Sequence, residues 1–307
     1  MFFEPKKTSF GRHETFALRF GWLTKGYQAL YDDSNIFTSD DSTMILGVGK
    51  NMVAAIRYWL VACQIRHQDT LQPTRVGYLI FDKDAGLDPY LEDEATIWLL
   101  HWLLASNPKN ATSWYWFFNR YHKAEFTSQE LTTALTDFVN DSIIEGKKPS
   151  INTLKNDAQL LHRMYTQSKI NNRAPLEDSL DSPFSLLNLV SIASDERRFI
   201  SRHQERASLP LAIFGYAVVD VMKSRKLKSI PIEELMYPRG DYCSPGSVFR
   251  MTENDLITKL EKLMVYMPGI FEIRDTAGIH QLFMTKDCEL DKFLLKHYQD
   301  YVIEALV

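Results

Sequence analysis

The stretch LGVGKNMVAAIRYWLVACQIR, residues Leu46–Arg66, decides the fold that we expect for the N-terminal part of the chain. A Gly-Val-Gly turn opens it, and a long helical pattern follows. Apolar residues spaced by three and four form one buried stripe of this helix. They are Val53, Ile56, Leu60 and Cys63, while the opposite face carries Lys50, Ala54, Arg57 and Tyr58. A helix that is entered through a glycine turn and is basic on its free face predicts the second helix of a helix-turn-helix.

The free face of this helix is suited to DNA. Lys50 and Arg57 can neutralise phosphates, and Asn51 can pair with a base edge. Arg19 and Lys25, on the segment before the turn, are further candidates for DNA binding. A P-loop is excluded, because Asn51 follows Lys50 where that motif needs serine or threonine. The alternative interpretation is an ordinary amphipathic helix with a solvated basic face.

Length and composition indicate a globular protein of two or three domains. The chain has 307 residues, of which 45% are hydrophobic and 24% are charged, so it can bury substantial cores. Its net charge is -4, so any contact with nucleic acid is expected to be a local basic patch. Three widely spaced cysteines without a CxxC pair, and the lack of a signal peptide or a membrane-spanning run, favour a cytoplasmic protein with no membrane association.

Residues 1–110 are expected to form a winged-helix-like domain. Apolar residues at helical spacing predict a first helix within residues 10–30, before the helix-turn-helix. Val76–Phe81 is a short apolar run that we interpret as a strand. Helix, turn, helix and strand in this order are typical of a winged helix. Asp88-Pro89 then combines a helix cap with a proline at the first helical position, so a mostly buried helix is expected from Asp88 onward.

Residues 111–235 are expected to be a helical middle region. Amphipathic or apolar patterns predict three of its helices, and these are Thr127–Val139, Ser150–Tyr165 and Leu209–Met222. Asn171–Pro183, rich in polar residues and proline, is interpreted as a loop.

Residues 236–307 are expected to form a second winged-helix-like domain. Met236–Ser247 is interpreted as a linker by composition. Thr252 begins a capping box before a helix, and the alternating segments 271–274 and 279–284 predict a hairpin. The predicted fold class is therefore mainly α with small β wings (α+β), with N-terminal and C-terminal winged-helix-like domains joined by a helical middle region.

Acidic residues cluster after the predicted strand and are candidates for chemistry. Asp88 and Glu92 are candidate ligands of Mg²⁺ or Mn²⁺, because nuclease chemistry needs carboxylates around such an ion. The candidate catalytic residues are Glu14, Asp88, Glu92 and Asp93. His13 beside Glu14 offers a general base, or a structural hydrogen bond. The alternative for the cluster is also structural, because a helix dipole favours acids in the first turns after a cap.

Several segments resemble one known family. They are HETFALRFGWLTKG (13–26), LGVGKNMVAAIRYW (46–59), DPYLEDEATIWLLHW (88–102) and the aromatic run ending at Asn119, with a weaker likeness up to TAGIHQLFM (276–284). The family is found beside bacterial DNA phosphorothioation genes, and the resemblance is to the SspB-like nicking subunits of the single-strand phosphorothioation (Ssp) defence system. It implies DNA, a cysteine desulfurase, an ATPase and an ATP-pyrophosphatase-like protein as partners. It implies no assigned active-site residues, so the residues named above rest on charge chemistry.

Three functions follow from these observations. The leading expectation is a DNA-binding protein that nicks one strand with Mg²⁺ or Mn²⁺, so that sulfur can be placed in the backbone. The first alternative is a non-catalytic winged-helix subunit that binds DNA or scaffolds the sulfur-transfer enzymes. The second is a transcription regulator, which would need a symmetric dimer and a palindromic site. The oligomeric state is open, with a homodimer among the alternatives.

Overall fold

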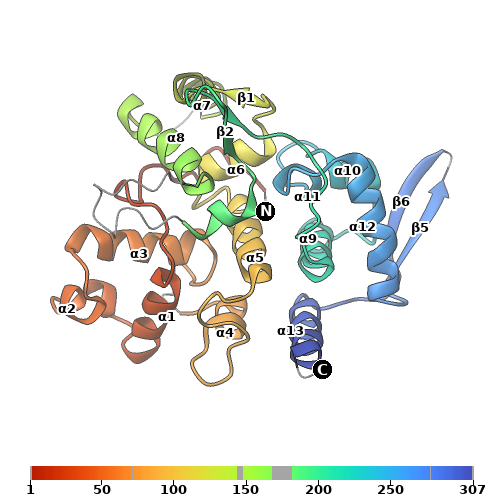
Figure 1. The fold of residues 1–307 in the computed structure, drawn as a ribbon, viewed down its shortest axis with the longest axis horizontal. Helices are drawn as coiled ribbons and strands as arrows, with labels where there is room; N and C mark the ends of the chain where they lie inside the picture. Colours follow the sequence, from red (N-terminus) through yellow and green to blue (C-terminus); the bar gives the residue numbers. More distant parts are fainter. Residues whose placement is uncertain (1, 71, 144–147, 168–181, 277, 306–307) are drawn as a thin grey trace. The chain divides into compact units, whose positions relative to one another are not determined.

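The computed structural model describes residues 2–70, 72–143, 148–167, 182–276 and 278–305. This part of the chain is mainly helical and contains two small antiparallel sheets (Figure 1), which confirms the α+β class. No helix in these ranges has the length and apolar composition needed to cross a membrane. Most of the predicted loop Asn171–Pro183 lies outside the described residues.

The chain divides into two compact units. The N-terminal unit consists of Glu4–Phe117 and Tyr121–Arg202. The C-terminal unit consists of Met1–Phe3, Phe118–Arg120 and His203–Val307. The domain boundaries near residues 110 and 235 stay a prediction.

The elements follow one another as a long series of helices with short strands between them. From Trp22 to Ile200 they are α1 (Trp22–Asp32), the 3-10 helix η1 (Ile36–Thr38), α2 (Ser42–Leu46), α3 (Lys50–Ala62), α4 (Arg75–Phe81), α5 (Glu94–Ala105), α6 (Thr112–Asn119), β1 (Glu125–Phe126), α7 (Ser128–Ser142), α8 (Ile151–Tyr165), the 3-10 helix η2 (Pro183–Leu187), β2 (Ser191–Ile192) and β3 (Phe199–Ile200). From Leu211 onward they are α9 (Leu211–Ser224), β4 (Ser229–Pro231), α10 (Ile232–Met236), α11 (Pro245–Val248), α12 (Glu253–Tyr266), β5 (Phe271–Thr276), β6 (Ile279–Met284) and α13 (Asp291–Ala305).

The helix-turn-helix predicted around the glycine turn is present. α2 ends at Gly47, which adopts a left-handed conformation with φ 61°, and α3 begins at Lys50. The predicted stripe of Val53, Ile56, Leu60 and Cys63 is buried. Lys50 and Arg57 on the opposite face are exposed, so the amphipathic pattern is confirmed. α1 packs closely on α3, since a Cβ atom at Gly26 would lie 2.6 Å from Cγ2 of Ile56.

Val76–Phe81 is helical and not a strand, so the predicted N-terminal wing is wrong. α4 begins after Thr74, whose hydroxyl accepts a hydrogen bond from the Gly77 amide at 3.0 Å. A short apolar run is compatible with a buried strand and with a buried helix. Gly77 favours the helix here, because it lets α4 approach the backbone of Ile65. A Cβ atom at residue 77 would lie only 2.2 Å from the Ile65 carbonyl oxygen.

Two predicted helix starts also differ from the structure. The helix expected from Asp88 begins at Glu94, and Asp93 caps it by accepting a backbone hydrogen bond at 2.8 Å. Asp88 lies in the loop before it, because its carboxylate accepts the backbone hydrogen bonds of that loop. The helical pattern predicted within residues 10–30 forms a helix only from Trp22 onward, since Gly21 has φ 76° and interrupts the pattern.

The helices predicted in the middle region are confirmed. α7 begins at Ser128 with a capping box, in which Thr127 and Glu130 exchange hydrogen bonds. α8 begins after Ser150, whose hydroxyl accepts a hydrogen bond from the Thr153 amide at 3.2 Å. α9, the predicted core helix, is buried along most of its length. Side-chain caps of this kind satisfy amides that the first turn of a helix leaves free.

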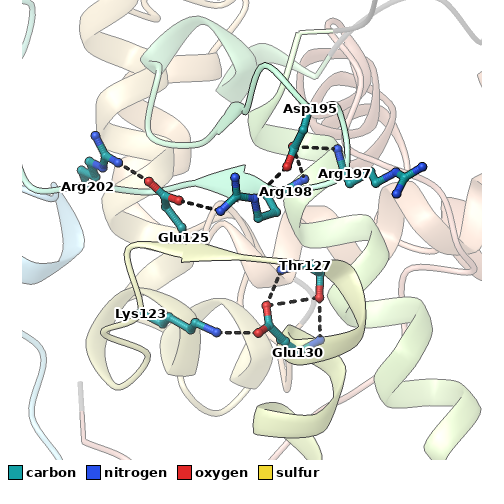
Figure 2. Close-up of polar contacts among 8 residues, drawn as sticks. All are labelled: Lys123, Glu125, Thr127, Glu130, Asp195, Arg197, Arg198 and Arg202. Carbon is teal, nitrogen blue, oxygen red and sulfur yellow. Dashed lines mark hydrogen bonds and ion pairs between the residues drawn. The ribbon is translucent and has the colours of Figure 1, made fainter.

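A small antiparallel sheet in the order β1–β3–β2 belongs to the N-terminal unit. Its surface carries a network of ion pairs (Figure 2). Glu125 of β1 pairs with Arg198 at 3.2 Å and also with Arg202. Asp195 pairs with the same Arg198 at 2.8 Å. These two arginines are therefore neutralised by neighbouring carboxylates.

The C-terminal unit combines helices with a second sheet in the order β4–β6–β5, antiparallel throughout. β5 and β6 form the predicted hairpin, and α12 begins after the predicted cap Thr252. The interpretation of Met236–Ser247 as a linker is wrong. The hydroxyls of Ser244 and Ser247 are buried and donate to the Met236 carbonyl at 3.0 and 3.2 Å, so this segment is packed inside the unit.

Gly77→Ala is expected to destabilise the protein by about 1–3 kcal/mol, because the added methyl group would overlap the Ile65 carbonyl. Helix propensity alone predicts the opposite sign, a gain of about 1 kcal/mol for alanine in a helix. Thermal unfolding of the variant and the wild type therefore decides between them. A gain in stability would contradict the close approach of α4 to residue 65.

His162 is expected to make the protein less stable as the pH falls from about 6.5 to about 4. Burial, followed by the charge of Arg163, lowers the pKa of His162 to about 4, and its ring stacks on Phe199 with centroids 4.0 Å apart. In this window the unfolded chain binds a proton at His162 that the folded chain does not, so folding loses up to about 3 kcal/mol. Unfolding of wild type, His162→Gln and the exposed control His67→Gln between pH 4 and 7 measures it. An equal pH dependence in wild type and His162→Gln would exclude this role.

Candidate nucleic-acid interface

An open, strongly basic pocket lies in the N-terminal unit. It has a volume of about 600 Å³ and is lined by the segment before α1, by α3 and by residues that follow α3 and α5. Six of the lining residues are cations: Lys6, Lys7, Arg12, Arg57, Arg66 and Lys109. Glu14 is the only carboxylate among the described residues that line it. In a chain of net charge -4, this is a local basic patch of the kind expected from the sequence.

The exposed face of α3 forms one wall of this basic pocket. Four of its residues line the pocket, namely Ala54, Arg57, Tyr58 and Val61. Lys50 lies one turn before Ala54 on the same face, and Asn51 is exposed beside it. The structure thus brings Lys50, Asn51 and Arg57, three of the predicted DNA-binding residues, to one side of one helix.

Arg66 is the buried cation of the pocket. Its exposed fraction is 3%, and its Nε and Nη1 atoms have no hydrogen-bond partner among the described residues. Its guanidinium lies 5.6 Å from the centroid of the Phe37 ring, a contact worth about 0.5–2 kcal/mol. Burial, and then the charge of Arg57, lower the pKa of Arg66. Burying an unpaired charge costs several kcal/mol, which Phe37 alone does not offset, so the arrangement favours an anion in the pocket.

A buried carboxylate holds residues 11–15 at the edge of this pocket. Asp157 of α8 accepts hydrogen bonds from the Gly11 amide at 2.9 Å and from the Ser113 hydroxyl at 2.5 Å. It also contacts Nε2 of His13 at 2.8 Å. Nδ1 of His13 accepts a backbone N–H at 3.1 Å, so the ring proton lies on Nε2 and is donated to Asp157. His13 therefore has a structural hydrogen bond, the alternative that the sequence left open for it.

Glu14 follows this anchor and lines the basic pocket. Its φ is 50° and that of Thr15 is 63°, a left-handed conformation that costs about 1–3 kcal/mol for such residues. Arg163 donates to the Thr15 carbonyl at 3.1 Å and helps to hold this turn. The Glu14 side chain is exposed. Of the candidate catalytic residues, it is the one that the structure brings to the same pocket as Arg57.

Two other predicted DNA-binding residues have contacts within the fold. The guanidinium of Arg19 lies 5.3 Å from the centroid of the Trp22 ring. Lys25 donates from Nζ to the carbonyl of Leu46 at the end of α2, at 3.1 Å. A cation in this position stabilises the free carbonyls of a helix C-terminus. Neither residue lines the basic pocket, and DNA contact by Arg19 and Lys25 stays a prediction.

The remaining candidate catalytic residues lie on the loop before α5. Asp88 is buried, and its carboxylate accepts hydrogen bonds from the Glu92 amide at 2.8 Å and the Asp93 amide at 3.2 Å. It also accepts one from the Thr96 hydroxyl. No group of three His, Cys, Asp or Glu side chains within the described ranges is placed to hold a metal ion. These contacts leave Asp88 poorly suited to a metal, and its role with Glu92 as a metal ligand stays a prediction.

Most cations of the pocket were not predicted from the sequence. They are Lys6, Lys7, Arg12, Arg66 and Lys109. Three of them fall within the first twelve residues, so their density was a signal that could have been used. Arg66 ends the stretch that decides the fold, but its burial depends on Phe37, which no local pattern predicts. Lys109 carries no sequence signal that we recognise.

Comparison with known proteins places the chain in a family. The family described as "Protein of unknown function (DUF4007)" matches residues 10–298. A crystal structure of SspB with a bound magnesium ion is 31% identical and has a TM-score of 0.82, with 97% of this chain and 89% of that chain covered. A second SspB crystal structure is 32% identical and has a TM-score of 0.80, with 95% and 88% covered. No curated protein matches the chain. The family predicted from the sequence is thus confirmed, and the chain belongs to the DUF4007 family of SspB-like proteins.

Proposed function

We propose that the protein binds the backbone of DNA at the basic pocket and nicks one strand as part of a DNA phosphorothioation system. The observation that carries this proposal is Arg66, a buried guanidinium beside Arg57 in a pocket lined by six cations. Phosphate oxygens are the acceptors that best match a guanidinium group. The similarity to SspB supports the same system. The partners that we propose are a cysteine desulfurase, an ATPase and an ATP-pyrophosphatase-like protein in the cytoplasm.

The pocket would bind one phosphodiester and α3 its neighbours. Arg12, Arg57 and Arg66 neutralise the phosphate in the pocket, while Lys50 contacts an adjacent phosphate and Asn51 a base edge. In nicking, water attacks the phosphorus atom and one bond from phosphorus to a sugar oxygen breaks. The products are one phosphate end and one hydroxyl end. Negative charge develops on the phosphate oxygens in the transition state, where preorganised cations are most effective.

Glu14 is the residue that we assign to the attacking water. Its carboxylate lines the pocket and can accept the proton that the water loses. Mg²⁺ typically binds through one or two carboxylates together with substrate phosphates, so a single carboxylate beside bound DNA fits this ion or Mn²⁺, which would supply charge neutralisation and a more acidic water. A magnesium ion is bound in the similar SspB structure, which supports the use of this metal.

We also propose that the C-terminal unit is a winged helix. The order α9, β4, α10, α11, α12 and the β5–β6 hairpin, with the sheet order β4–β6–β5, supports it. α12 would then be the helix that DNA-binding winged helices place in the major groove. Lys259 of α12 is buried and donates to the Leu209 carbonyl at 3.3 Å. This internal contact leaves DNA binding better supported at the N-terminal unit than at α12.

Replacing Arg12 and Arg57 with alanine is expected to weaken DNA binding and to flatten its salt dependence. Each cation removed from a phosphate contact lowers the slope of log K against log salt by about 1. The double variant should therefore lose about 2 from its slope. Fluorescence anisotropy with a labelled duplex at several KCl concentrations measures this slope.

Arg197→Ala is the matched control for this experiment. Arg197 is exposed in the turn between β2 and β3, and its side chain points away from the acids around it (Figure 2). Its replacement removes one positive charge, where the double variant removes two, and leaves the basic pocket unchanged, so the slope should keep its wild-type value. An unchanged slope in the double variant, or an equal loss in Arg197→Ala, would place the DNA contact elsewhere.

Glu14→Gln is expected to lose nicking by about 100-fold or more while DNA binding is kept, because the glutamine cannot accept the water proton. Relaxation of a supercoiled plasmid with Mg²⁺ or Mn²⁺ measures the activity, and chelation of the metal should abolish it in the wild type. Anisotropy with the same duplex measures binding by the variant. A loss of both activities together would indicate a damaged pocket and leave the assignment of Glu14 unsupported.

The same plasmid relaxation assay is carried out with Glu92→Gln as a comparison, since Glu92 is an exposed acid of the cluster before α5. Loss of nicking in Glu92→Gln, with normal nicking in Glu14→Gln, would place the chemistry at that loop and contradict our assignment. Absence of nicking by the wild type, even with its partner proteins present, would favour the non-catalytic DNA-binding subunit.

A further inference from the structure

A groove of about 610 Å³ is lined by residues of α10, α12 and the β5–β6 hairpin of the C-terminal unit. These elements lie side by side in Figure 1. Much of its lining is apolar, with Ile232, Met236, Leu256, Ile257, Ile273 and Ile279. Three carboxylates line it as well, those of Glu233, Glu253 and Glu261. Among the described lining residues there is no lysine or arginine. The groove therefore has the opposite chemistry to the basic pocket.

Acidic and apolar side chains alternate along one face of α12. Glu253, Ile257, Glu261 and Val265 are spaced by four residues, which keeps them on the same side of the helix. All four are exposed, Ile257 by 44% and Val265 by 82%. Covering apolar surface is favourable in proportion to the area that it removes from water. Binding of a partner that covers this face of α12 with matching apolar and charged groups is therefore favourable.

The apolar surface continues across the groove. Tyr237, which follows α10, is 45% exposed, and Ile279 at the start of β6 is 52% exposed. The Tyr237 hydroxyl donates to the Glu253 carboxylate at 2.8 Å, which fixes this acid beside the aromatic ring. Contiguous exposed apolar groups rimmed by polar ones are typical of protein interaction sites.

The charge of the groove decides which kind of partner fits. DNA phosphates would lie against three carboxylates, and like charges in contact across an interface cost several kcal/mol. Lysine or arginine side chains would instead face Glu253 and Glu261, with an apolar side chain over Ile257 between them. These two acids are separated by about 12 Å along α12. Two cations placed two turns apart on a partner helix have a similar spacing, so each can face one of these acids.

We propose that this groove docks a basic amphipathic helix of a partner protein. The helix carries two cations about two turns apart, facing the acids of α12, and an apolar anchor between them that enters the groove. The proposal does not depend on DNA binding by the N-terminal unit, because it uses none of the residues of the basic pocket.

The test uses a synthetic helical peptide with leucines on one face and lysines two turns apart, and a twin in which glutamate replaces each lysine. Fluorescence anisotropy with the full chain is expected to show binding of the lysine peptide and not of the twin. Glu253→Lys/Glu261→Lys should weaken binding of the lysine peptide by about tenfold or more and allow the twin to bind. Ile257→Asp should weaken binding of the lysine peptide as well.

Asp137→Lys/Asp141→Lys is the control, since both acids are exposed on α7 and the change in net charge is the same. It should leave peptide binding unchanged. Thermal unfolding of each variant shows that its fold is intact. Equal binding of both peptides, or wild-type binding by the groove variants, would overturn the proposal. So would the conversion of a dimer to a monomer by Ile257→Asp in sedimentation, because the occupant would then be a second copy of the chain.

Discussion

The buried carboxylate of Asp157 is the constraint on which the basic pocket depends. A charge inside a core is tolerated only when hydrogen bonds compensate it, because an unpaired buried charge costs several kcal/mol. The donors to Asp157 are the Gly11 amide, the His13 ring and the Ser113 hydroxyl. They fix the segment before α1 to α6 and α8, and no side chain fits at Gly11, where a Cβ atom would lie 2.5 Å from Thr153. Arg12 and Glu14, beside these donors in sequence, line the pocket as a consequence.

The chain has a net charge of -4, but its two units carry surfaces of opposite charge. In the N-terminal unit, arginines of the small sheet are paired with carboxylates (Figure 2), whereas Arg66 of the basic pocket keeps guanidinium nitrogens without partners among the described residues. In the C-terminal unit, α12 exposes acids and apolar groups, and its buried Lys259 is used within the unit. The DNA binding proposed for the basic pocket and the helix docking proposed for the groove of α12 use different residues, so the two ligands would not compete for them.

The elements that depend on local sequence patterns could be predicted from the sequence. The elements that depend on contacts between distant residues could not. The stripe of α3, the helices α7 and α8 and the β5–β6 hairpin follow from period and turn residues, which act within a few positions of the chain. The strand predicted for Val76–Phe81 was wrong because a short apolar run is compatible with both a strand and a helix. Which of the two forms depends here on the close approach of Gly77 to the carbonyl of Ile65, which is distant in sequence. Arg57 was identified because it lies on a periodic face. Arg66 was not, since its burial against Phe37 has no counterpart in the local sequence.

The acidic cluster shows why density of charge is a weak guide to a site. Loops need acceptors for their free amides, and aspartate supplies them. Asp82 accepts two backbone hydrogen bonds at 2.9 and 3.1 Å, Asp88 accepts two more, and Asp93 caps α5. These contacts give the three aspartates a structural role, which accounts for their density without a metal. Glu14 and Arg66 differ from these aspartates. Glu14 is an exposed acid on left-handed backbone. Arg66 is a buried cation, and two of its nitrogens have no hydrogen-bond partner within the described chain. The proposed site therefore rests on side chains that the fold keeps uncommitted at a cost in stability.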